Sequence, residues 1–306
     1  MKKVTVFFEE PNLEDYPFTN PKYKQSYCEL AQIIQQKQGE FWIARSNETY
    51  LGQQKFSRGW RWNGVRFEKA GAFTASVIYD KRGDSRYRAS FRDESNIKIL
   101  NPNKIADICE DKLKTYELFT EFCPQTFLVK NEAELKIALE KIPSEKKVIK
   151  PRDMACGEGV QIDNIEKILV SKKKFPLLVQ EFIDTSKGIP NLIDGIHDFR
   201  VILINGEIIL SFIRTPPPNS LIANIAQGGS VHEVPLTKIP TNIHKITKKI
   251  DSQFTEFSRA YSIDFGFENN VPKLIEMNSQ PAIFCREDGP DFVHHKKKLA
   301  EVLLSF

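Results

Sequence analysis

The 306-residue sequence contains no long hydrophobic run and neither of the two common glycine-rich nucleotide fingerprints. No stretch approaches the roughly 18 consecutive apolar residues that cross a bilayer, so we expect no membrane span. The first apolar run, residues 4–8, is short and ends in acidic residues, which is untypical of a signal peptide and favours a cytoplasmic protein. The patterns GxxxxGK(S/T) and GxGxxG are both absent, which excludes a P-loop and a dinucleotide-binding fingerprint.

Cysteine pairs and a strong net charge are also missing. The five cysteines are scattered without a CxxC pair, which argues against a disulfide framework or a zinc site and favours a reducing compartment: Cys28, Cys109, Cys123, Cys156 and Cys285. The net charge of +4 is too weak to indicate nucleic acid, and we expect no such partner. Residues 81–92 do form a basic run, which is either a solvated loop or an anion-binding segment near a substrate pocket.

The hydrophobic periodicity predicts a chain with α/β and α+β parts. We expect strands at residues 4–8, 40–46, 75–80, 146–151 and 175–184. Helices are expected at residues 23–37, within residues 101–122 with residues 111–115 near the middle, and at residues 131–142. Asn205-Gly206 predicts a hairpin within residues 197–214, because both residues tolerate positive φ. Residues 294–306 predict an amphipathic closing helix whose charged side chains are solvated.

Two carboxylates and an amide occur in apolar strands near the C-terminus. The segments YSIDFGF and KLIEMNS flank a turn-prone ENNVP. A hairpin centred on Asn270 would place Asp264 opposite Glu276, and Asn278 would share their face because side chains alternate along a strand. Opposed carboxylates repel each other, and Mg²⁺ would relieve the repulsion because it prefers oxygen ligands. The alternative is a solvent-facing hairpin whose acids have no special role.

Residues suited to a nucleotide occur upstream of this hairpin. Lys150 ends an apolar strand, and Gly157 and Gly159 bracket a loop whose backbone can approach phosphate oxygens closely. Gln180 and Glu181 end a buried strand and offer the polar edge beside apolar faces that an adenine ring requires. Taken singly, each piece has an ordinary alternative, a surface turn for the first and a core strand that reaches the surface for the second.

Two arginines and a glycine-rich loop follow. Arg200 and Arg214 alternate with strand hydrophobics, and guanidinium groups suit carboxylate or phosphate recognition, although a single arginine is commonly a surface ion-pair residue. Asn224 precedes a Gly-Gly pair in a segment that is typical of a loop close to a ligand. Cys156 and Cys285 have no identifiable base, so we expect them to be packing residues rather than nucleophiles.

In combination these pieces resemble the ATP-grasp superfamily, most closely the RimK and glutathione-synthetase-type ligases. The pattern comprises Asp111-Lys112, VIKP with GEGV, LVQEFI, HDFR, an arginine, ANxxQGG, an aspartate, and IEMN twelve residues after that aspartate. The resemblance implies an ATP-grasp fold, in which two α+β subdomains sandwich ATP, preceded by a small pre-ATP-grasp α/β domain. It also implies domain boundaries: 1–100 for the pre-ATP-grasp domain, 101–184 for the central lid subdomain and 185–306 for the C-terminal subdomain with the metal site.

The resemblance implies roles for individual residues as well. Carried over residue by residue, it assigns ATP to Lys112, Lys150, Gly157, Gly159, Gln180, Glu181, Phe182, Asp198 and Asn224, two Mg²⁺ ions (or Mn²⁺) to Asp264, Glu276 and Asn278, and the transferred phosphoryl group or acylphosphate to Arg200 and Arg214. The sequence departs from the family at Ile222, where RimK-type ligases carry an arginine, and at NSQPAI, which replaces an ending similar to NSSPG.

The activity that the resemblance implies is ATP-dependent ligation of a carboxylate and an amine. The carboxylate would attack the γ-phosphate, and the amine would then displace phosphate from the acylphosphate. We expect a small-molecule or peptide carboxylate and an amine acceptor as partners, and self-association is left open. Two alternatives remain: an ATP-grasp enzyme that makes a thioester or a phosphorylated product, and a non-catalytic protein that binds nucleotides or nucleic acid.

Overall fold

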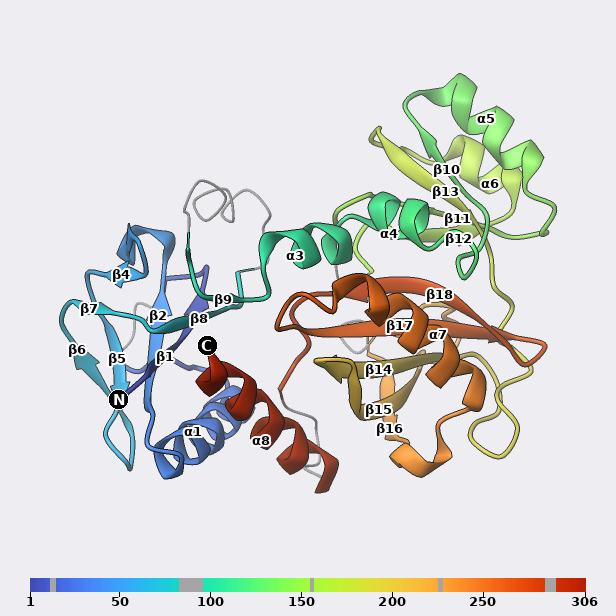
Figure 1. The fold of residues 1–306 in the computed structure, drawn as a ribbon. Helices are drawn as coiled ribbons and strands as arrows, with labels where there is room; N and C mark the ends of the chain where they lie inside the picture. The colour runs from blue at the N-terminus through green and yellow to red at the C-terminus, as the bar shows by residue number, and fades with distance from the viewer. Residues whose placement is uncertain (12–14, 83–95, 155–156, 225–227, 284–289) are drawn as a thin grey trace.

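The computed structural model describes residues 1–306 apart from 12–14, 83–95, 155–156, 225–227 and 284–289, and for 290–292 only the backbone. Most of the basic run 81–92, Cys156 and Cys285 therefore lie outside the described residues. The described chain forms a six-stranded sheet near the N-terminus, a four-stranded sheet in the middle and a five-stranded sheet toward the C-terminus (Figure 1). Nothing in this arrangement tests the boundaries at residues 100 and 184, which stay predictions.

The N-terminal sheet has the strand order β6-β5-β2-β1-β8-β9, in which β1 is parallel to β2 and β8. Its strands are β1 (Lys3–Phe8), β2 (Glu40–Arg45), β5 (Gly59–Trp62), β6 (Phe67–Ala70), β8 (Val77–Asp80) and β9 (Ile99–Leu100). Helix α1 (Pro21–Gln36) begins after Asn20, whose side chain accepts hydrogen bonds from the first turn. A small sheet of β3 (Tyr50–Gly52), β4 (Lys55–Phe56) and β7 (Phe73–Thr74) follows a 3-10 turn at Asn47–Thr49.

The helix expected around residues 111–115 is two helices, so this prediction is wrong at its centre. Helix α3 (Asn103–Glu110) ends before Asp111, and α4 (Lys112–Leu118) begins after it. Asp111 has extended backbone angles, and its Oδ1 accepts a hydrogen bond of 3.0 Å from the Leu113 amide. Aspartate caps a helix better than it continues one, because its side chain competes for backbone N–H groups. The break sets Lys112 at the first position of α4.

The central sheet has the order β10-β13-β11-β12 with antiparallel neighbours throughout. Its strands are β10 (Thr126–Val129), β11 (Lys147–Lys150), β12 (Gln161–Asp163) and β13 (Leu177–Glu181). Helices α5 (Glu132–Lys141) and α6 (Ile165–Val170) cover one face, where Leu139 and Ile168 pack with Ile149 and Val179. Strand alternation therefore turns Lys150 and Gln180 toward the opposite face.

The C-terminal sheet has the order β16-β15-β14-β17-β18. Its strands are β14 (Asp198–Ile204), β15 (Glu207–Thr215), β16 (Ser230–Glu233), β17 (Ala260–Glu268) and β18 (Val271–Asn278). The predicted hairpin at Asn205-Gly206 joins β14 and β15, with positive φ at both residues. Helices α3 and α7 (Thr241–Asp251), the latter flanked by 3-10 turns at Leu236–Lys238 and Ser252–Phe254, cover the apolar face of this sheet.

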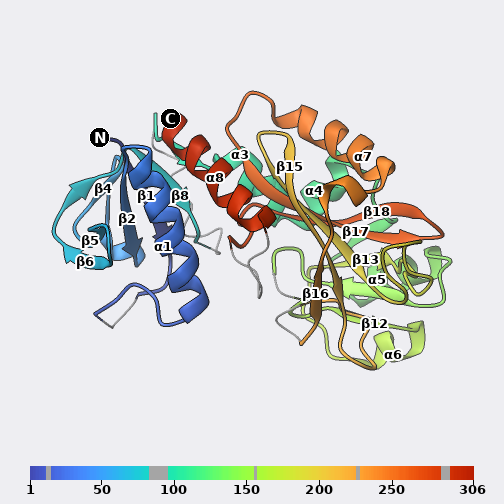
Figure 2. The same ribbon diagram turned by 90° about the horizontal axis from the view of Figure 1, so that it is seen from below.

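Helix α8 (Pro290–Ser305) joins the C-terminal part of the chain to the N-terminal sheet. Figures 1 and 2 both show it beside α1. Leu299 and Leu303 of α8 share a buried cluster with Leu30 of α1 and with Ile204 of β14. Among the described residues, no helix has both the length and the apolar character that a membrane crossing demands.

The prediction that the charges of this helix are solvated is wrong for two residues. His295 is fully buried, and Lys296 is 1% exposed and pairs with Glu29 of α1. Neither ring nitrogen of His295 has a hydrogen-bond partner in the part of the chain that the structure describes. Burial, together with the charges of Lys81, Lys296 and His294, lowers the pKa of His295 to about 3.

We expect His295 to make the protein less stable as the pH falls. The folded state keeps His295 neutral, whereas the unfolded chain protonates it below pH 6.5, so the unfolded state gains protons first. Between pH 7.5 and 5.5 this residue should cost about 1.4 kcal/mol of unfolding free energy. Urea titrations at the two pH values should find that His295→Met loses this part of the pH dependence, while a variant at exposed His232 keeps it. An unchanged pH slope in His295→Met would contradict the burial argument.

Candidate active site

The two carboxylates of the β17–β18 hairpin lie opposite each other because of a β-bulge. The strands turn at Asn269 and Asn270, both with positive φ, and a regular ladder from that turn would set Asp264 against Ile275. The register shifts beside Asp264, which is therefore paired with Glu276. The bulge thus brings both carboxylates to the same face of the sheet, as the sequence predicts.

We call this side of the C-terminal sheet the charged face. It carries one polar side chain after another on β14, β15, β17 and β18: Asp198, Arg200, Arg214, Asp264, Glu276 and Asn278. The register pairs Arg200 with Asp264 across β14 and β17, and Asp198 with Arg214 across β14 and β15. Directly paired residues in an antiparallel ladder share a face, so the sheet itself brings acids and arginines together.

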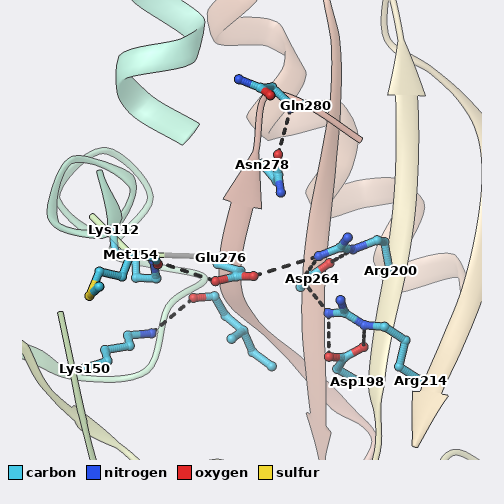
Figure 3. A network of polar contacts seen from close by, with 11 residues as sticks. Lys112, Lys150, Met154, Asp198, Arg200, Arg214, Asp264, Glu276, Asn278 and Gln280 are labelled. Atoms are coloured by element: carbon cyan, nitrogen blue, oxygen red, sulfur yellow. Dashed lines mark hydrogen bonds and ion pairs between the residues drawn. The ribbon is translucent and has the colours of Figure 1, made fainter. Parts of the chain in front are cut away.

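Both arginines of the charged face bind carboxylates through Nε and Nη2 (Figure 3). Arg200 binds Asp264 through Nε and Nη2, both at 2.5 Å. Arg214 binds Asp198 through Nε at 2.7 Å and Nη2 at 2.6 Å, and its Nη2 also lies 2.6 Å from Asp264. Glu276 lies at the edge of this network, 3.9 Å from Arg200. The arginines that we assigned to a phosphoryl group therefore hold Asp264 and Asp198 in this state.

The network moves the pKa values of its two aspartates in opposite directions. Burial raises the pKa of Asp198 to about 7, and the charge of Asp264 adds to the shift while Arg214 opposes it. Burial would also raise the pKa of Asp264, but Arg200 and Arg214 outweigh it and lower the value to about 2. Asp264 therefore stays ionised at neutral pH, as a metal-ligating carboxylate must.

Lysines approach Glu276 and its strand from α4 and from the central sheet. The Nζ of Lys112 lies 4.0 Å from Glu276 and donates to the carbonyl of Met154 in the loop between β11 and β12. The Nζ of Lys150 is 3.5 Å from the carbonyl of Ile275 and 2.7 Å from Gln180 Oε1. Burial lowers the pKa of Lys150 to about 8, which the charge of Glu276 partly offsets. Both lysines that we assigned to ATP phosphates thus meet at the charged face.

The loop after β11 that contains Gly157 and Gly159 contacts the start of α4. Arg152 at its start binds Asp111 through Nε at 2.7 Å and Nη2 at 2.5 Å. Gly157 and Gly159 both have positive φ, and a Cβ at Gly159 would lie 2.7 Å from the Pro151 ring. Substitution at Gly159 would therefore be strained by backbone and neighbour alike.

The residues expected at the adenine ring occupy the end of β13. Gln180 is buried and holds both Lys150 and the hydroxyl of Thr126, the latter at 2.8 Å. The amide of Glu181 donates to the Gln125 carbonyl at 2.9 Å, and Phe182 follows directly, half-buried. Gln180 therefore links the predicted adenine edge to a predicted phosphate lysine.

Asn224 lies near the charged face because its carbonyl binds Gly229, which packs against the residue after Arg214. The amide of Gly229 donates to the Asn224 carbonyl at 3.0 Å. A Cβ at Gly229 would lie 2.8 Å from the carbonyl oxygen of Thr215, which follows Arg214. Only glycine permits this close approach of two backbone segments.

A cleft of about 1170 Å³ opens beside these elements. Its lining includes Lys150, Arg152 and Gly159 together with Asp107 and Glu110 of α3. Neither Asp264 nor Glu276 lines it. The contacts of Lys112 with Met154 and of Arg152 with Asp111 hold the start of the glycine loop against α4.

The turn after Asn278 is held from two sides by residues whose contacts here the sequence analysis did not predict. Lys81, just after β8, donates to the carbonyls of Gln280 at 2.9 Å and Pro281 at 3.0 Å. Asn101 donates to the carbonyl of Ser279 at 2.6 Å and also binds Ala260 of β17. The backbone N–H of Gln280 in turn donates to Asn278 Oδ1 at 2.7 Å (Figure 3). Lys81 begins the basic run 81–92 and Asn101 directly follows the strand Ile99–Leu100, but neither feature indicated a contact with this turn.

The oxygen donors of the charged face fit a Mg²⁺ ion that arrives with a nucleotide. Among the described residues, no three acidic, histidine or cysteine side chains converge as a ready-made metal cluster. Asp264, Glu276 and Asn278 offer two carboxylates and one amide oxygen, and Mg²⁺ usually takes one or two carboxylates while phosphates and water complete its shell. Since Asp264 is bound by guanidinium groups, a cation would compete with Arg200 for it.

Comparison with known proteins agrees with this geometry. Residues 111–257 match the family model described as prokaryotic glutathione synthetase, ATP-grasp domain. The glutathione synthetase of Synechococcus elongatus is 30% identical over 159 residues, which cover 49% of this chain and 46% of that protein. The probable alpha-L-glutamate ligase of Shewanella pealeana is 25% identical over 197 residues, which cover 61% of this chain and 40% of that protein. Each match therefore spans less than half of the relative's own length.

A solved structure matches over the whole chain. The RiPP-associated ATP-grasp ligase of Chryseobacterium gregarium, in complex with ADP and a leader and core peptide, superposes with a TM-score of 0.65 at 13% identity. The match covers 100% of this chain and 97% of that one. The chain thus has the ATP-grasp fold, as the sequence predicts. Its sequence is similar to the ATP-grasp domain of prokaryotic glutathione synthetases over just under half of the chain, and to proteins named glutathione synthetase and probable alpha-L-glutamate ligase.

Proposed function

We propose that the protein is an ATP-dependent carboxylate–amine ligase that works through an acylphosphate. The charged face carries the proposal, because it combines ionised metal-type ligands with cations for phosphate. Its counted side chains are three carboxylates and four cations, which leaves one positive charge (4 − 3 = +1) if all are ionised: Asp198, Asp264 and Glu276 against Lys112, Lys150, Arg200 and Arg214. Relatives named as glutathione synthetase and glutamate ligase support C–N bond formation.

ATP would lie between the central and C-terminal sheets. Gln180, Glu181 and Phe182 would take the adenine, and Lys112 and Lys150 the phosphates. Asp264, Glu276 and Asn278 would hold two Mg²⁺ ions, replaceable by Mn²⁺, which would neutralise charge on the transferred phosphoryl group. Asp198 and Asn224 would border the nucleotide.

Arg200 is the residue whose partner would change. A cation on Asp264 weakens the hold of that carboxylate on Arg200, because two positive charges then share one negative charge. The guanidinium of Arg200 would then be available to the phosphoryl oxygens, while Arg214 keeps its bidentate partner Asp198. Exchange of partners in this way would supply positive charge only when the nucleotide is present.

The proposed reaction has two steps. A carboxylate oxygen attacks the γ-phosphorus, the bond between that phosphorus and the β–γ bridging oxygen breaks, and ADP leaves. An amine nitrogen then attacks the carbonyl carbon of the acylphosphate, phosphate leaves, and the amine loses a proton as the amide forms. Gly157 and Gly159 lie in a loop that would close over the phosphates and keep water from the acylphosphate.

The carboxylate and the amine would come from a small molecule or a peptide. The ligase with the similar fold was solved in complex with a leader and core peptide, which favours including peptides among the candidates. We propose neither a membrane nor a nucleic-acid partner for this reaction.

Hydroxylamine provides a test that does not need the natural amine. Wild-type protein with ATP, Mg²⁺, hydroxylamine and a panel of amino acids, dipeptides and dicarboxylic acids should form a hydroxamate from at least one carboxylate, because hydroxylamine captures acylphosphates. The hydroxamate and ADP should appear in equal amounts by mass spectrometry. ADP without any hydroxamate would instead favour a phosphorylated product, and no carboxylate-dependent ADP would refute ligation.

Glu276→Gln is the matched inactive control. Glu276 is part-exposed and lies 3.9 Å and 4.0 Å from its ionic neighbours, so the variant should keep its stability. Loss of a metal-ligating carboxylate should lower hydroxamate formation by roughly 100-fold or more.

A further inference from the structure

Ser262 is a buried hydroxyl on the charged face that the proposed mechanism does not use. It lies on β17 two residues before Asp264 and is paired with Asn278 of β18. Its side chain therefore points to the same side as the metal-type ligands. Ser262 is 1% exposed, and among the described residues its Oγ has no hydrogen-bond partner. A buried hydroxyl without a partner is costly, so a partner that arrives with the substrate is worth seeking.

A second serine of the same sheet behaves differently. Ser211 on β15 is equally buried, and its Oγ donates to the Val234 carbonyl at 2.6 Å. Ser211 lies opposite Val201, on the apolar side of the sheet. The contrast between the two serines means that burial alone does not leave a hydroxyl unpaired here.

Gly266, Asp264 and Ser262 follow one another along β17 on the charged face, and their order indicates how ATP would lie along it. A Cβ at Gly266 would contact Ile183 and Thr185, which lie just beyond the adenine residues of β13. Asp264 comes next on this face, and Ser262 follows on the far side of Asp264 from Gly266. Successive side chains on one face are roughly 6.6 Å apart along a strand. If adenine lies at the Gly266 end and the metal ligands hold the phosphates, the γ-phosphate points toward Ser262.

The N-terminal sheet approaches the far end of the charged face. Lys81, which follows β8, binds the carbonyls of Gln280 and Pro281, two and three residues after Asn278. The Ser262–Asn278 pair thus lies between Asp264 and the part of the protein that closes this end of the site. In an in-line transfer the acceptor lies on the side of the γ-phosphate opposite ADP, which is this end.

We propose that Ser262 binds the substrate carboxylate, with its O–H donating to the oxygen that becomes the acyl oxygen of the acylphosphate. The inference rests on the proposed function and adds the place of the acceptor, beyond the metal ligands and away from adenine. Ser262 is 1% exposed and the proposed metal ligand Asp264 is 2% exposed, so both residues have to become accessible when substrates bind. The carboxylate then satisfies a hydroxyl that is otherwise without a partner, and Ser262 orients it for attack on the γ-phosphorus.

The first test compares the stability of two serine variants without ligand. Ser262→Ala removes an unpaired hydroxyl, so its thermal midpoint should equal or exceed that of the wild type. Ser211→Ala removes a satisfied hydroxyl and leaves the Val234 carbonyl unpaired, so its midpoint should fall by roughly 2–5 °C. A fall in Ser262→Ala as large as that in Ser211→Ala would overturn the inference, since Ser262 would then have a partner within the protein.

The second test uses acetyl phosphate, the smallest stable acylphosphate, and runs the first step in reverse. The phosphoryl group moves from acetyl phosphate to ADP in the presence of Mg²⁺, acetate leaves, and luciferase measures the ATP formed. Ser262→Ala should raise the KM for acetyl phosphate roughly tenfold and leave the KM for ADP within twofold, because only the acyl oxygen loses its donor. Ser211→Ala should leave both values within twofold.

The outcomes separate this inference from the proposed function. Equal KM values for acetyl phosphate in the wild type and Ser262→Ala would overturn the role of Ser262 and leave the ligase proposal standing. The wild type could instead fail to use acetyl phosphate although hydroxamate still forms with another carboxylate. That result would refute an acyl-oxygen site that any acylphosphate can occupy. Failure of both reactions would refute the ligase itself.

Discussion

Replacing Asp264 with asparagine should abolish ligation and also destabilise the fold. Asp264 accepts three hydrogen bonds from Arg200 and Arg214 while almost fully buried. An amide leaves the buried Arg214 and the partly buried Arg200 short of one negative charge and turns an N–H group toward them. Removal of one partner from a buried ion pair typically costs about 3–5 kcal/mol. Hydroxamate formation should fall by roughly 10³-fold, because the same carboxylate is a proposed metal ligand. Urea unfolding and the hydroxamate assay measure the two losses.

Asp251→Asn is the control that separates the two effects of Asp264→Asn. Asp251 is also buried, and it accepts hydrogen bonds from Arg259 at 2.6 Å and from the Tyr261 hydroxyl at 2.9 Å. Its replacement should cost a similar unfolding free energy and leave the activity of the folded protein unchanged. If Asp264→Asn remains as stable as the wild type, Asp264 does not balance the two arginines. If it remains active, Asp264 is not a metal ligand.

The pairing of Asp264 with Glu276 shows how far local sequence carries. The spacing around ENNVP predicts a hairpin and the opposed carboxylates, and both are found. The prediction placed a single residue, Asn270, at the centre, whereas the turn has two residues and a bulge restores the register. A bulge is set by how β18 packs on its neighbours, and the local sequence carries no clear signal for it.

The partners of Arg200 and Arg214 show where local sequence stops. Their side-chain type and their alternation on strands indicate anion binding, and they do bind anions. The anions belong to the protein, however, because the pairing of β14 with β15 and β17 joins residues up to 64 positions apart. Nothing in a strand's own sequence specifies which residue faces it across such a distance.

The predictions for the charged residues of helix α8 and for a continuous helix at Asp111 were wrong for related reasons. The run of histidine and lysine in α8 is typical of a solvated face, yet α1 and the sheets bury His295 and Lys296. Tertiary packing decides which face of an amphipathic helix is covered, and Lys296 tolerates it because Glu29 lies across the contact. At Asp111 the signal was present, since aspartate is a favoured N-cap, but the surrounding helical pattern outweighed it.

Replacing Lys150 with methionine should weaken ATP binding strongly while changing stability little. Lys150 is 5% exposed, and burial is the main cause that lowers its pKa to about 8, so burying its charged form is unfavourable. Methionine fills a similar volume without that cost, and Gln180 loses one partner while keeping Thr126. The two effects nearly cancel, so the unfolding free energy without ligand should change by less than about 1 kcal/mol. Calorimetry should find ATP·Mg²⁺ binding weaker by roughly 100-fold, because an ATP phosphate loses the ammonium group that would bind it.

Lys147 supplies the matched comparison, because it lies on the same strand with the same 5% exposure. It occupies the other side of β11 and donates to the backbone carbonyl of Ser144, away from the charged face. Lys147→Met should therefore lose stability and keep nucleotide affinity, the reverse of Lys150→Met. We thus predict opposite effects for two buried lysines three residues apart. The difference depends only on which side of the central sheet faces the nucleotide. Equal nucleotide affinity in the two variants would mean that ATP does not lie between the sheets.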